Sequence, residues 1–103
     1  MATLVFTEDA LAQIRDIGRY TENTWGVKQR NLYLEKIFAG CESIRMSPDK
    51  GKFRTEIDEG LRSAYVEQHV IYYYVHSYAK SEEVRVVGVL HQRMEPSLHL
   101  VSH

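Results

Sequence analysis

Histidine side chains are the first residues of this chain to test for chemistry, because imidazole binds metal ions and transfers protons near neutral pH. The chain has five histidines. His69 and His76 lie an odd number of residues apart in one predicted strand, so their side chains point to opposite faces of a sheet. His99 and His103 are four residues apart, a spacing that aligns side chains only on a helix. These spacings predict no metal site.

Basic side chains near the predicted sheet are a second candidate, because guanidinium groups bind phosphate and carboxylate through paired hydrogen bonds. The candidate oxyanion cluster consists of Arg54, Arg62, Arg85 and Arg93 together with Lys50, Lys52 and His91. The alternative is that these side chains are solvated charges paired with nearby acids, which are Glu56, Asp58, Glu59 and Glu95. The sequence alone favours this second interpretation.

Familiar catalytic motifs do not occur in the chain. It contains no Gly-rich phosphate loop, no HExxH, no GxSxG and no CxxC. The single cysteine, Cys41, lies on the apolar side of a predicted helix, where a thiol acts as a small hydrophobic group. One cysteine also provides no disulfide framework, which is typical of proteins in a reducing compartment.

The length and composition of the chain limit its class. With 103 residues, it has room for one domain over residues 1–103, built on a single two-layer core. The charged content of 26% and net charge of −1 argue against a general nucleic-acid binder, which carries a basic excess. No apolar stretch reaches the ~20 residues of a membrane span, and the N-terminus lacks the pattern of a signal peptide. We expect a cytoplasmic protein with no membrane partner.

The elements that must position these side chains begin with a strand and two helices. Residues Thr3–Phe6 predict a short strand. Apolar residues at helical spacing then predict a helix over Glu8–Thr24, with Gly26 as its C-terminal glycine. A second helix is predicted from Val27 to just before Ser47-Pro48, because the residue before a proline resists helical geometry. The two helices form a hairpin around Gly26.

A predicted β-hairpin follows and is the centre of the sheet. Leu61–Val66 and the β-branched and aromatic run Val70–Val75 predict two strands that meet at Glu67-Gln68. Alternation places Ile71, Tyr73 and Val75 on one face, while Val70, Tyr72, Tyr74 and His76 share the other. We expect the first face to pack under the helices and the second face to suit a partner.

The remaining segments complete an α+β fold. Phe53–Ile57 predicts a short strand, Tyr78–Glu83 a loop, and Val84–His91 the last strand. In that strand, alternation places Val84, Val86, Gly88 and Leu90 opposite Arg85, Val87, Val89 and His91. The order is β-α-α-β-β-β, a two-helix hairpin packed on a small, mostly antiparallel sheet. The predicted core comprises Leu11, Ile14, Leu34, Ile37, Phe38, Cys41, Ile71, Tyr73, Val75 and Val86.

Four groups of residues together follow the pattern of a known protein family. They are Tyr20…Trp25-Gly26, Ser47-Pro48…Gly51, Gly60-Leu61-Arg62…His69-Val70-Ile71-Tyr72-Tyr73, and Val89-Leu90-His91-Gln92-Arg93-Met94-Glu95 followed by Leu100. In order and spacing, these groups resemble the ParE toxins of the RelE/ParE superfamily of bacterial type II toxin–antitoxin systems. The resemblance covers nearly the whole chain and implies the same β-α-α-β-β-β fold.

The resemblance implies a toxin that poisons DNA gyrase and is neutralised by a ParD-like antitoxin. It also implies no cofactor, no catalytic residue and no sequence-specific nucleic-acid binding. One alternative is the RelE-like branch, which cleaves mRNA on the ribosome with basic residues and usually a C-terminal tyrosine. Arg62 and Arg93 match arginines of that branch, but no tyrosine follows Tyr78, so His91 or His99 would have to replace it. Another alternative is a member of the fold that has lost its toxicity.

Two sets of partner contacts follow from this resemblance. The antitoxin set combines aromatic anchors with two arginines for acidic groups: Tyr20, Trp25, Tyr33, Arg62, Tyr72, Tyr74 and Arg85. The gyrase set covers the end of the last strand and the tail: His91, Gln92, Arg93, Met94, Glu95 and Leu100. We expect truncation after Met94 to preserve folding and antitoxin binding and to abolish gyrase inhibition.

Overall fold

The computed structural model describes residues 2–100 of the chain. Its elements in chain order are β1 (Thr3–Phe6), α1 (Glu8–Trp25), α2 (Val27–Met46), the 3-10 turn η1 (Pro48–Lys50), β2 (Lys52–Phe53), β3 (Arg62–Val66), β4 (His69–Tyr78), β5 (Ser81–His91) and the 3-10 turn η2 (Pro96–Leu98). The α+β class and the two-helix hairpin on a mostly antiparallel sheet are confirmed, and the short strand predicted before the β-hairpin is present as the two-residue β2.

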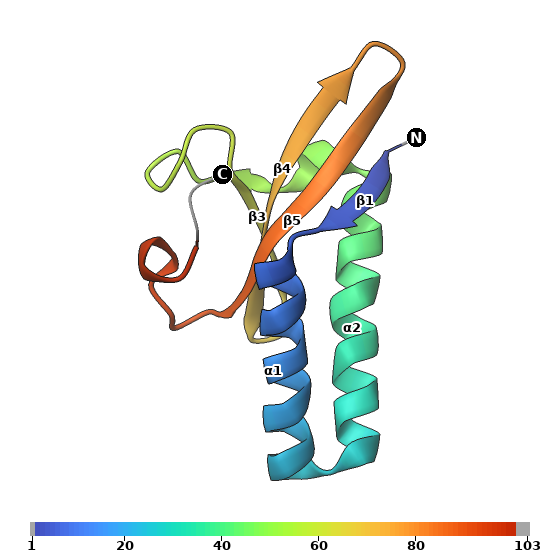
Figure 1. The fold of residues 1–103 in the computed structure, drawn as a ribbon, viewed down its shortest axis with the longest axis vertical. Helices are drawn as coiled ribbons and strands as arrows, with labels where there is room; N and C mark the ends of the chain where they lie inside the picture. The colour runs from blue at the N-terminus through green and yellow to red at the C-terminus, as the bar shows by residue number, and fades with distance from the viewer. Residues whose placement is uncertain (1, 101–103) are drawn as a thin grey trace.

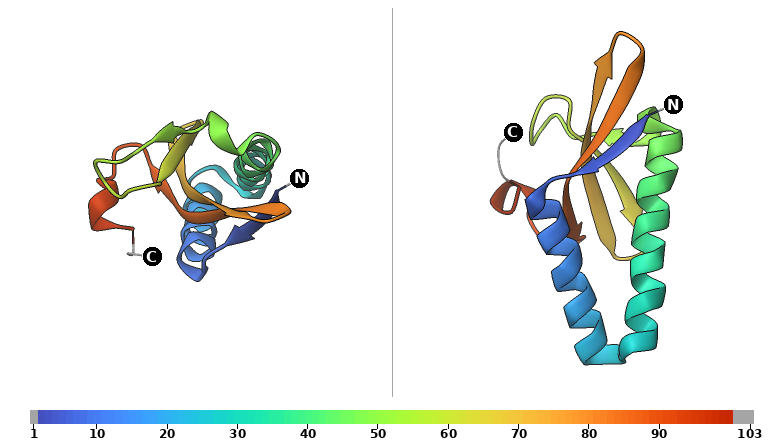
Figure 2. Two further views of the ribbon diagram at one scale, coloured as in Figure 1. Left: turned by 90° about the horizontal axis from the view of Figure 1, so that it is seen from above. Right: turned by 45° about the vertical axis from the view of Figure 1, so that its right-hand side comes forward.

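The strands form one sheet in the order β1-β5-β4-β3-β2. Strand β1 is parallel to β5, and the other neighbouring pairs are antiparallel. Both helices cover one face of this sheet, and the closed end of their hairpin extends past the sheet (Figure 1). Figure 2 shows the same arrangement from two further directions. The start of β4 and the end of β5 are therefore the parts of the sheet nearest to the protruding half of the hairpin.

Local signals explain the ends of the two helices. The Thr7 side chain accepts a hydrogen bond from the Ala10 N–H at 3.1 Å, so it caps α1 as a threonine at this position typically does. Gly26 has a φ of 94°, which a glycine adopts without steric cost, and it separates α1 from α2. The predicted helix boundaries are confirmed, except that α1 ends one residue later than predicted, at Trp25.

Two hydrophobic clusters lie on the two faces of the sheet. The helix-side cluster contains six predicted core residues, which are Ile14, Ile37, Cys41, Ile71, Tyr73 and Val86, with Leu34 and Val75 partly buried against it. Burial raises the pKa of the Cys41 thiol to about 12, so this thiol stays protonated. The prediction is wrong for Leu11 and Phe38, each of which is 43% exposed. The apolar stripe of the helices is wider than the strip that the sheet covers, and the exposed Phe38 ring meets the Phe6 ring edge to face with centroids 6.0 Å apart.

The outer cluster lies on the face of the sheet that turns away from the helices. It is formed by Leu61, Val70, Tyr72, Val87 and Leu90, with Ile57, Tyr74 and Leu100 packed against it. The predicted alternation along β4 is confirmed, because its two sets of side chains enter different clusters. The outer face is not an open partner surface, however, because the segment before β3 and the C-terminal tail cover it.

Three predicted details of the strands are wrong. Strand β2 ends at Phe53, because the following residues form a turn in which the Ile57 N–H donates to the Arg54 carbonyl at 3.0 Å. The expected loop over Tyr78–Glu83 is mostly strand, since β4 and β5 pair up to Tyr78 opposite Ser81. The strict alternation along β5 is broken by a β-bulge, in which Tyr72 lies opposite Gly88 and Tyr73 opposite Val86.

The bulge changes the face of every residue that follows it in β5. Val87 is the extra residue without a partner on β4, and it packs in the outer cluster. Val89 consequently joins the helix-side cluster, while Leu90 joins the outer cluster. His91 lies opposite His69 and shares its face. The predicted grouping of Val86 with Leu90 on one face is therefore wrong.

Candidate functional site

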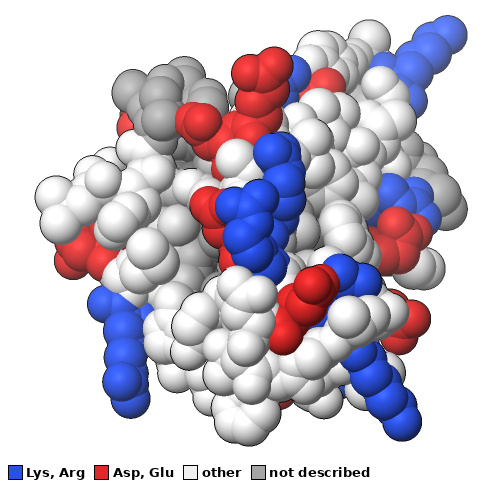
Figure 3. Space-filling model, turned by 60° about the horizontal axis from the view of Figure 1, so that its bottom comes forward, with Lys and Arg blue, Asp and Glu red and all other residues white. Residues whose placement is uncertain are grey.

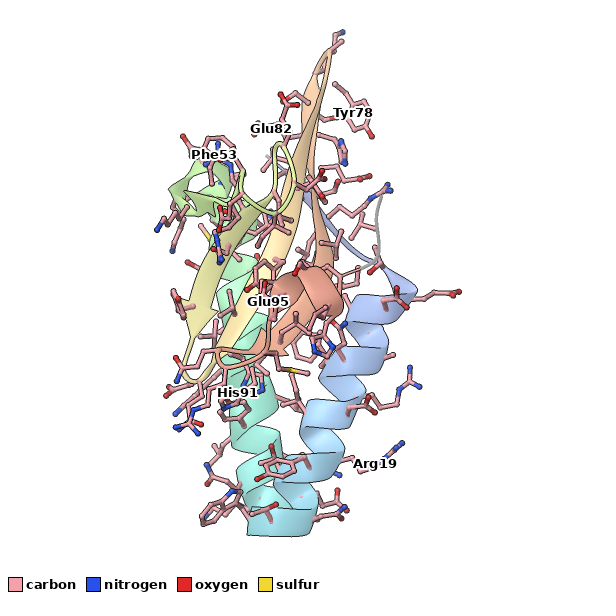
Figure 4. All side chains as sticks on the ribbon, turned by 90° about the vertical axis from the view of Figure 1, so that its left-hand side faces the viewer. Arg19, Phe53, Tyr78, Glu82, His91 and Glu95 are labelled. Carbon is pink, nitrogen blue, oxygen red and sulfur yellow. The ribbon has the colours of Figure 1, made fainter. Side chains whose placement is uncertain are left out.

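An open groove of about 890 Å³ lies between the hairpin and the end of the sheet. It is lined by α1, α2, the β3–β4 turn and the end of β5: Gln13, Asp16, Ile17, Tyr20, Thr21, Trp25, Gln29, Tyr33, Glu67, Gln68, His69, Val89, Leu90, His91 and Met94. Figure 4 places His91 at the lower end of the sheet, above the tip of the hairpin. The volume is in the range of specific ligand and side-chain pockets.

Two walls of this groove carry residues that sequence analysis assigned to different partners. The helix wall consists of Tyr20, Trp25 and Tyr33, and the first two are 67% and 70% exposed. The exit wall consists of His91 and Met94, at the point where the chain leaves β5. Exposed aromatic side chains beside a hollow are typical of protein-binding surfaces. The fold thus brings part of the predicted antitoxin set and part of the predicted gyrase set into one groove.

The floor of the groove holds a chain of three rings. The Tyr33 hydroxyl lies 2.5 Å from His69 Nδ1, which ties α2 to the start of β4. The His69 and His91 rings meet edge to face with centroids 5.4 Å apart. Burial, and secondarily the neighbouring His91, lower the pKa of His69 to about 4. Burial also raises the pKa of Tyr33. Both His69 and Tyr33 are therefore neutral at pH 7.

Backbone hydrogen bonds hold the exit wall in place. The Gln92 N–H donates to the Gln68 carbonyl at 2.8 Å, and the Met94 N–H donates to the His91 carbonyl at 2.9 Å. The Arg93 N–H donates to His91 Nδ1 at 3.1 Å. Because Nδ1 accepts this bond, the neutral His91 ring carries its proton on Nε2. The position of the exit wall therefore depends on the β3–β4 turn and on the His91 ring itself.

The charges around the groove do not suit a phosphate backbone. None of the described residues that line it is Lys or Arg, whereas Asp16 and Glu67 are among them. Glu67 is paired with Lys36 at 3.2 Å. On the face shown in Figure 3, basic and acidic side chains are interspersed and no patch of one sign dominates. An aromatic groove without basic side chains suits an apolar protein segment better than a nucleic acid.

The other predicted antitoxin contacts lie outside the groove. Tyr72 is only 3% exposed in the outer cluster, so it is not an exposed anchor. Tyr74 is half-buried, and its hydroxyl donates to Asp58. Arg85 is paired with Glu83 at 2.8 Å.

Arg62 also lies away from the groove. Its guanidinium donates to the carbonyls of Asp49 and Gly51 at 3.1 and 3.0 Å, and it stacks over Phe53 at 3.8 Å from the ring centre. Arg54 lies instead beside Tyr72 in the outer cluster and is paired with Glu56. The basic residues therefore do not form a common oxyanion cluster, in agreement with the interpretation that the sequence favoured.

The predicted gyrase residues divide between the groove and the tail. Gln92, Arg93 and Glu95 are exposed, and Glu95 caps the turn η2 by accepting from the Ser97 N–H. Leu100 is half-buried against the outer cluster. Removal of the chain after Met94 takes away this packing, so we expect such a truncation to lower stability; that it leaves folding largely intact stays a prediction.

Two of the groove residues outside the predicted partner sets make specific contacts, His69 and Gln13. His69 was considered only as a metal ligand, although its position directly after a tight turn placed it at the end of the sheet. Gln13 is a half-buried polar residue among the inward-facing residues of α1, a pattern that signals a specific hydrogen bond. In residues 2–100, no three histidine, cysteine or acidic side chains are grouped closely enough to hold a metal ion.

Neither α1 nor α2, the long helices of the described part, has an apolar stretch long enough to cross a bilayer.

Comparisons with known proteins agree with this architecture. A family model described as "ParE toxin of type II toxin-antitoxin system, parDE" matches residues 4–96. Toxin ParE of Escherichia coli is 32% identical over 97 residues, covering 92% of this chain and 89% of the relative. Toxin ParE1 of Caulobacter vibrioides is 33% identical over 91 residues, covering 88% of this chain and 90% of the relative.

Solved structures share the fold at lower sequence identity. A chain of the structure described as "Chromosomal ParDE TA system from P. aeruginosa" has a TM-score of 0.72 at 16% identity, and the match covers 88% of this chain and 96% of that one. The structure described as "YoeB/ParE toxin from Agrobacterium tumefaciens" has a TM-score of 0.61 at 17% identity, with 86% and 97% covered. With a family match over most of its length and relatives above 30% identity, the chain belongs to the ParE toxin family of type II toxin–antitoxin systems.

Proposed function

We propose that this toxin inhibits DNA gyrase and that a ParD-like antitoxin neutralises it by binding in the groove. The observation that carries the proposal is the groove without basic side chains, with exposed Tyr20 and Trp25 on one wall and Met94 on the other. Membership of the ParE family supports the toxin assignment, and the similar P. aeruginosa structure, which is described as a ParDE system, supports an antitoxin partner.

The antitoxin supplies a flexible apolar segment that becomes ordered in the groove. Trp and Tyr are the residue types that contribute most binding energy at protein interfaces, because they bury a large area at a small cost in conformational entropy. The helix wall offers three such side chains, and Gln29 and Gln68 provide hydrogen-bonding groups at its edges. The antitoxin segment therefore uses apolar side chains for affinity and its backbone for the polar contacts.

Gyrase binds at the exit wall and at the exposed residues that follow β5. Inhibition of this kind requires a binding surface and no chemical step by the toxin. The residues His91–Glu95 form a compact turn held by backbone hydrogen bonds, so their side chains are presented in a defined arrangement. A preorganised turn loses little conformational entropy on binding.

The RelE-like ribonuclease is the alternative, and the adjacent His69 and His91 rings are the observation in its favour. A ribonuclease must transfer protons and also stabilise the negative charge that develops on the phosphate. The described lining of the groove contains no Lys or Arg for the second task, and the lowered pKa of His69 makes it a weak base. The gyrase proposal is therefore preferred.

The test compares supercoiling by purified gyrase with cleavage of ribosome-bound mRNA. We expect the wild-type toxin to inhibit supercoiling and to leave mRNA intact. Met94→Ala should weaken inhibition, and Trp25→Ala should lower affinity for the ParD-like protein encoded beside the toxin gene by about 30-fold, equivalent to a contact of about 2 kcal/mol. Tyr65→Ala is the matched control, because Tyr65 is 70% exposed on β3 outside the groove.

Two results would contradict the proposal. Cleavage of mRNA that is lost in His91→Ala, with gyrase unaffected by any variant, would establish the ribonuclease alternative. Equal effects of Trp25→Ala and Tyr65→Ala on antitoxin affinity would remove the groove from the interface.

A further inference from the structure

The starting observation is the edge of β5 that faces β1. Strand β1 pairs with β5 only from Glu83 to Val86, and the chain then turns away into α1. Beyond that point no strand of residues 2–100 pairs with this edge of β5. The Val89 N–H, in the next part of the strand, donates instead to Oε1 of Gln13 at 2.8 Å. A side chain of α1 thus takes over a hydrogen bond that a neighbouring strand would otherwise make.

This hydrogen bond lies directly after the bulge at Val87. A bulge adds one residue to one strand, so it reverses the face of all later residues. With the bulge in place, His91 lies on the groove side and contacts His69. Strict alternation from Val86 would turn His91 to the outer face, and the exit wall would no longer exist in its present form.

The tail supports the bulge from the other side of the sheet. A Cβ atom built on Gly88 would lie 2.3 Å from Cδ2 of Leu100 and 3.3 Å from Oε1 of Gln13. The glycine therefore lets Leu100 pack directly on the strand while Gln13 approaches from the helix side. Leu100 provides only apolar packing, whereas Gln13 makes a directional bond to a specific backbone N–H. The directional hydrogen bond between Gln13 and the Val89 N–H therefore selects the register of β5 against β4.

We propose that Gln13 is the positioning residue of the partner site: its bond to the Val89 N–H locks the β5 bulge and thereby holds His91 and Met94 on the groove side. The effect on gyrase rests on the proposed function, whereas the effect on the register does not. Gln13 acts through the strand, and neither partner needs to touch it.

The test uses three variants of the full chain. Gln13→Leu keeps the size of the side chain and removes the acceptor. Gln13→Glu keeps an acceptor oxygen at the same reach and serves as the rescue variant. Asn23→Leu makes the same change from amide to leucine at an exposed position of α1 outside the groove, and it controls for the loss of a polar group.

The decisive readout is the histidine titration, followed by NMR. In the wild type we expect His69 to titrate at about 4 and to show close ring contacts to His91. In Gln13→Leu the ring contacts should be lost, and the His69 midpoint should rise, because the nearby His91 is the second cause of its lowered pKa after burial. A loss of stability alone would not move this midpoint in the folded population. Gln13→Glu and Asn23→Leu should both resemble the wild type.

Inhibition of gyrase supplies the second readout. We expect Gln13→Leu to inhibit at least about tenfold less well than the wild type at a temperature where both are folded, and Gln13→Glu to recover most of the loss. Retention of the His69–His91 contacts in Gln13→Leu would overturn the proposal, and so would an equal change in Asn23→Leu. If the wild type does not inhibit gyrase, the proposed function fails, while the NMR experiment still decides whether Gln13 sets the register.

Discussion

Acidification should destabilise this protein through one residue of the groove floor, His69. The perturbation is a change from pH 7.5 to pH 4.5, applied to the wild type and to His69→Gln. The folded state lowers the pKa of His69 from 6.5 to about 4, chiefly because burial disfavours the charged ring and secondarily because His91 is nearby. Above pH 6.5 the ring is neutral in both states, and the stabilising contribution of neutral His69 is fully present.

The sign and size of the effect follow from these two pKa values. Between pH 6.5 and 4 the unfolded chain binds a proton that the folded protein does not, so stability is lost as the pH falls through this range. A gap of about 2.5 pH units corresponds to at most about 3.4 kcal/mol. Because solvent still reaches the half-buried ring, we expect about 1–2 kcal/mol of this amount.

The assay is urea unfolding at the two pH values, followed by circular dichroism. Glutamine does not titrate, so His69→Gln should lose about 1–2 kcal/mol less than the wild type between pH 7.5 and 4.5. The other ionisable groups are common to both proteins and cancel in the comparison. Equal losses in the two proteins would refute the reasoning, because they would mean that His69 takes up its proton equally easily in the folded and unfolded states.

Two further comparisons of variants test the packing. Ile37→Ala should lower the free energy of unfolding by about 2–5 kcal/mol, because Ile37 is fully buried. Phe38→Ala should lower it by only about 1–2 kcal/mol, because Phe38 is 43% exposed. Urea unfolding of both variants checks this order, and a larger loss for Phe38→Ala would contradict it. Gly88→Ala should destabilise the protein by about 1–3 kcal/mol, because the new Cβ atom meets Leu100. Adding Leu100→Ala should recover part of that loss, and a double variant less stable than Gly88→Ala alone would show that the tail does not cause it.

The elements of this fold could be predicted because their signals are local. The cap at Thr7, the glycine at Gly26 and the turn at Glu67-Gln68 each act through neighbours a few residues away in the chain. The two faces of β4 followed from simple alternation, since that strand is regular over its buried part. The aromatic residues of the helix wall, Tyr20, Trp25 and Tyr33, do line one groove, while their role as antitoxin contacts stays a prediction from the family resemblance.

The shape of the groove depended on contacts between distant parts of the chain. Gly88 is a local hint of the bulge in β5, because an isolated glycine in a strand often marks one, but Val86, Val87 and Val89 suit either face equally well and do not fix its place. Its register is set by a hydrogen bond from Val89 to Gln13, 76 positions away, and by the packing of Leu100 on Gly88.

The burial of Tyr72 has a similar origin. This side chain is covered by segments that precede β3 and follow β5, which alternation within one strand does not describe. The sequence by itself therefore determined which elements form and which of their faces are apolar, because helix and strand geometry repeat over a few residues. The tertiary structure decided which side chains meet in the groove, because one extra residue in β5 reverses the face of every side chain that follows it in the strand.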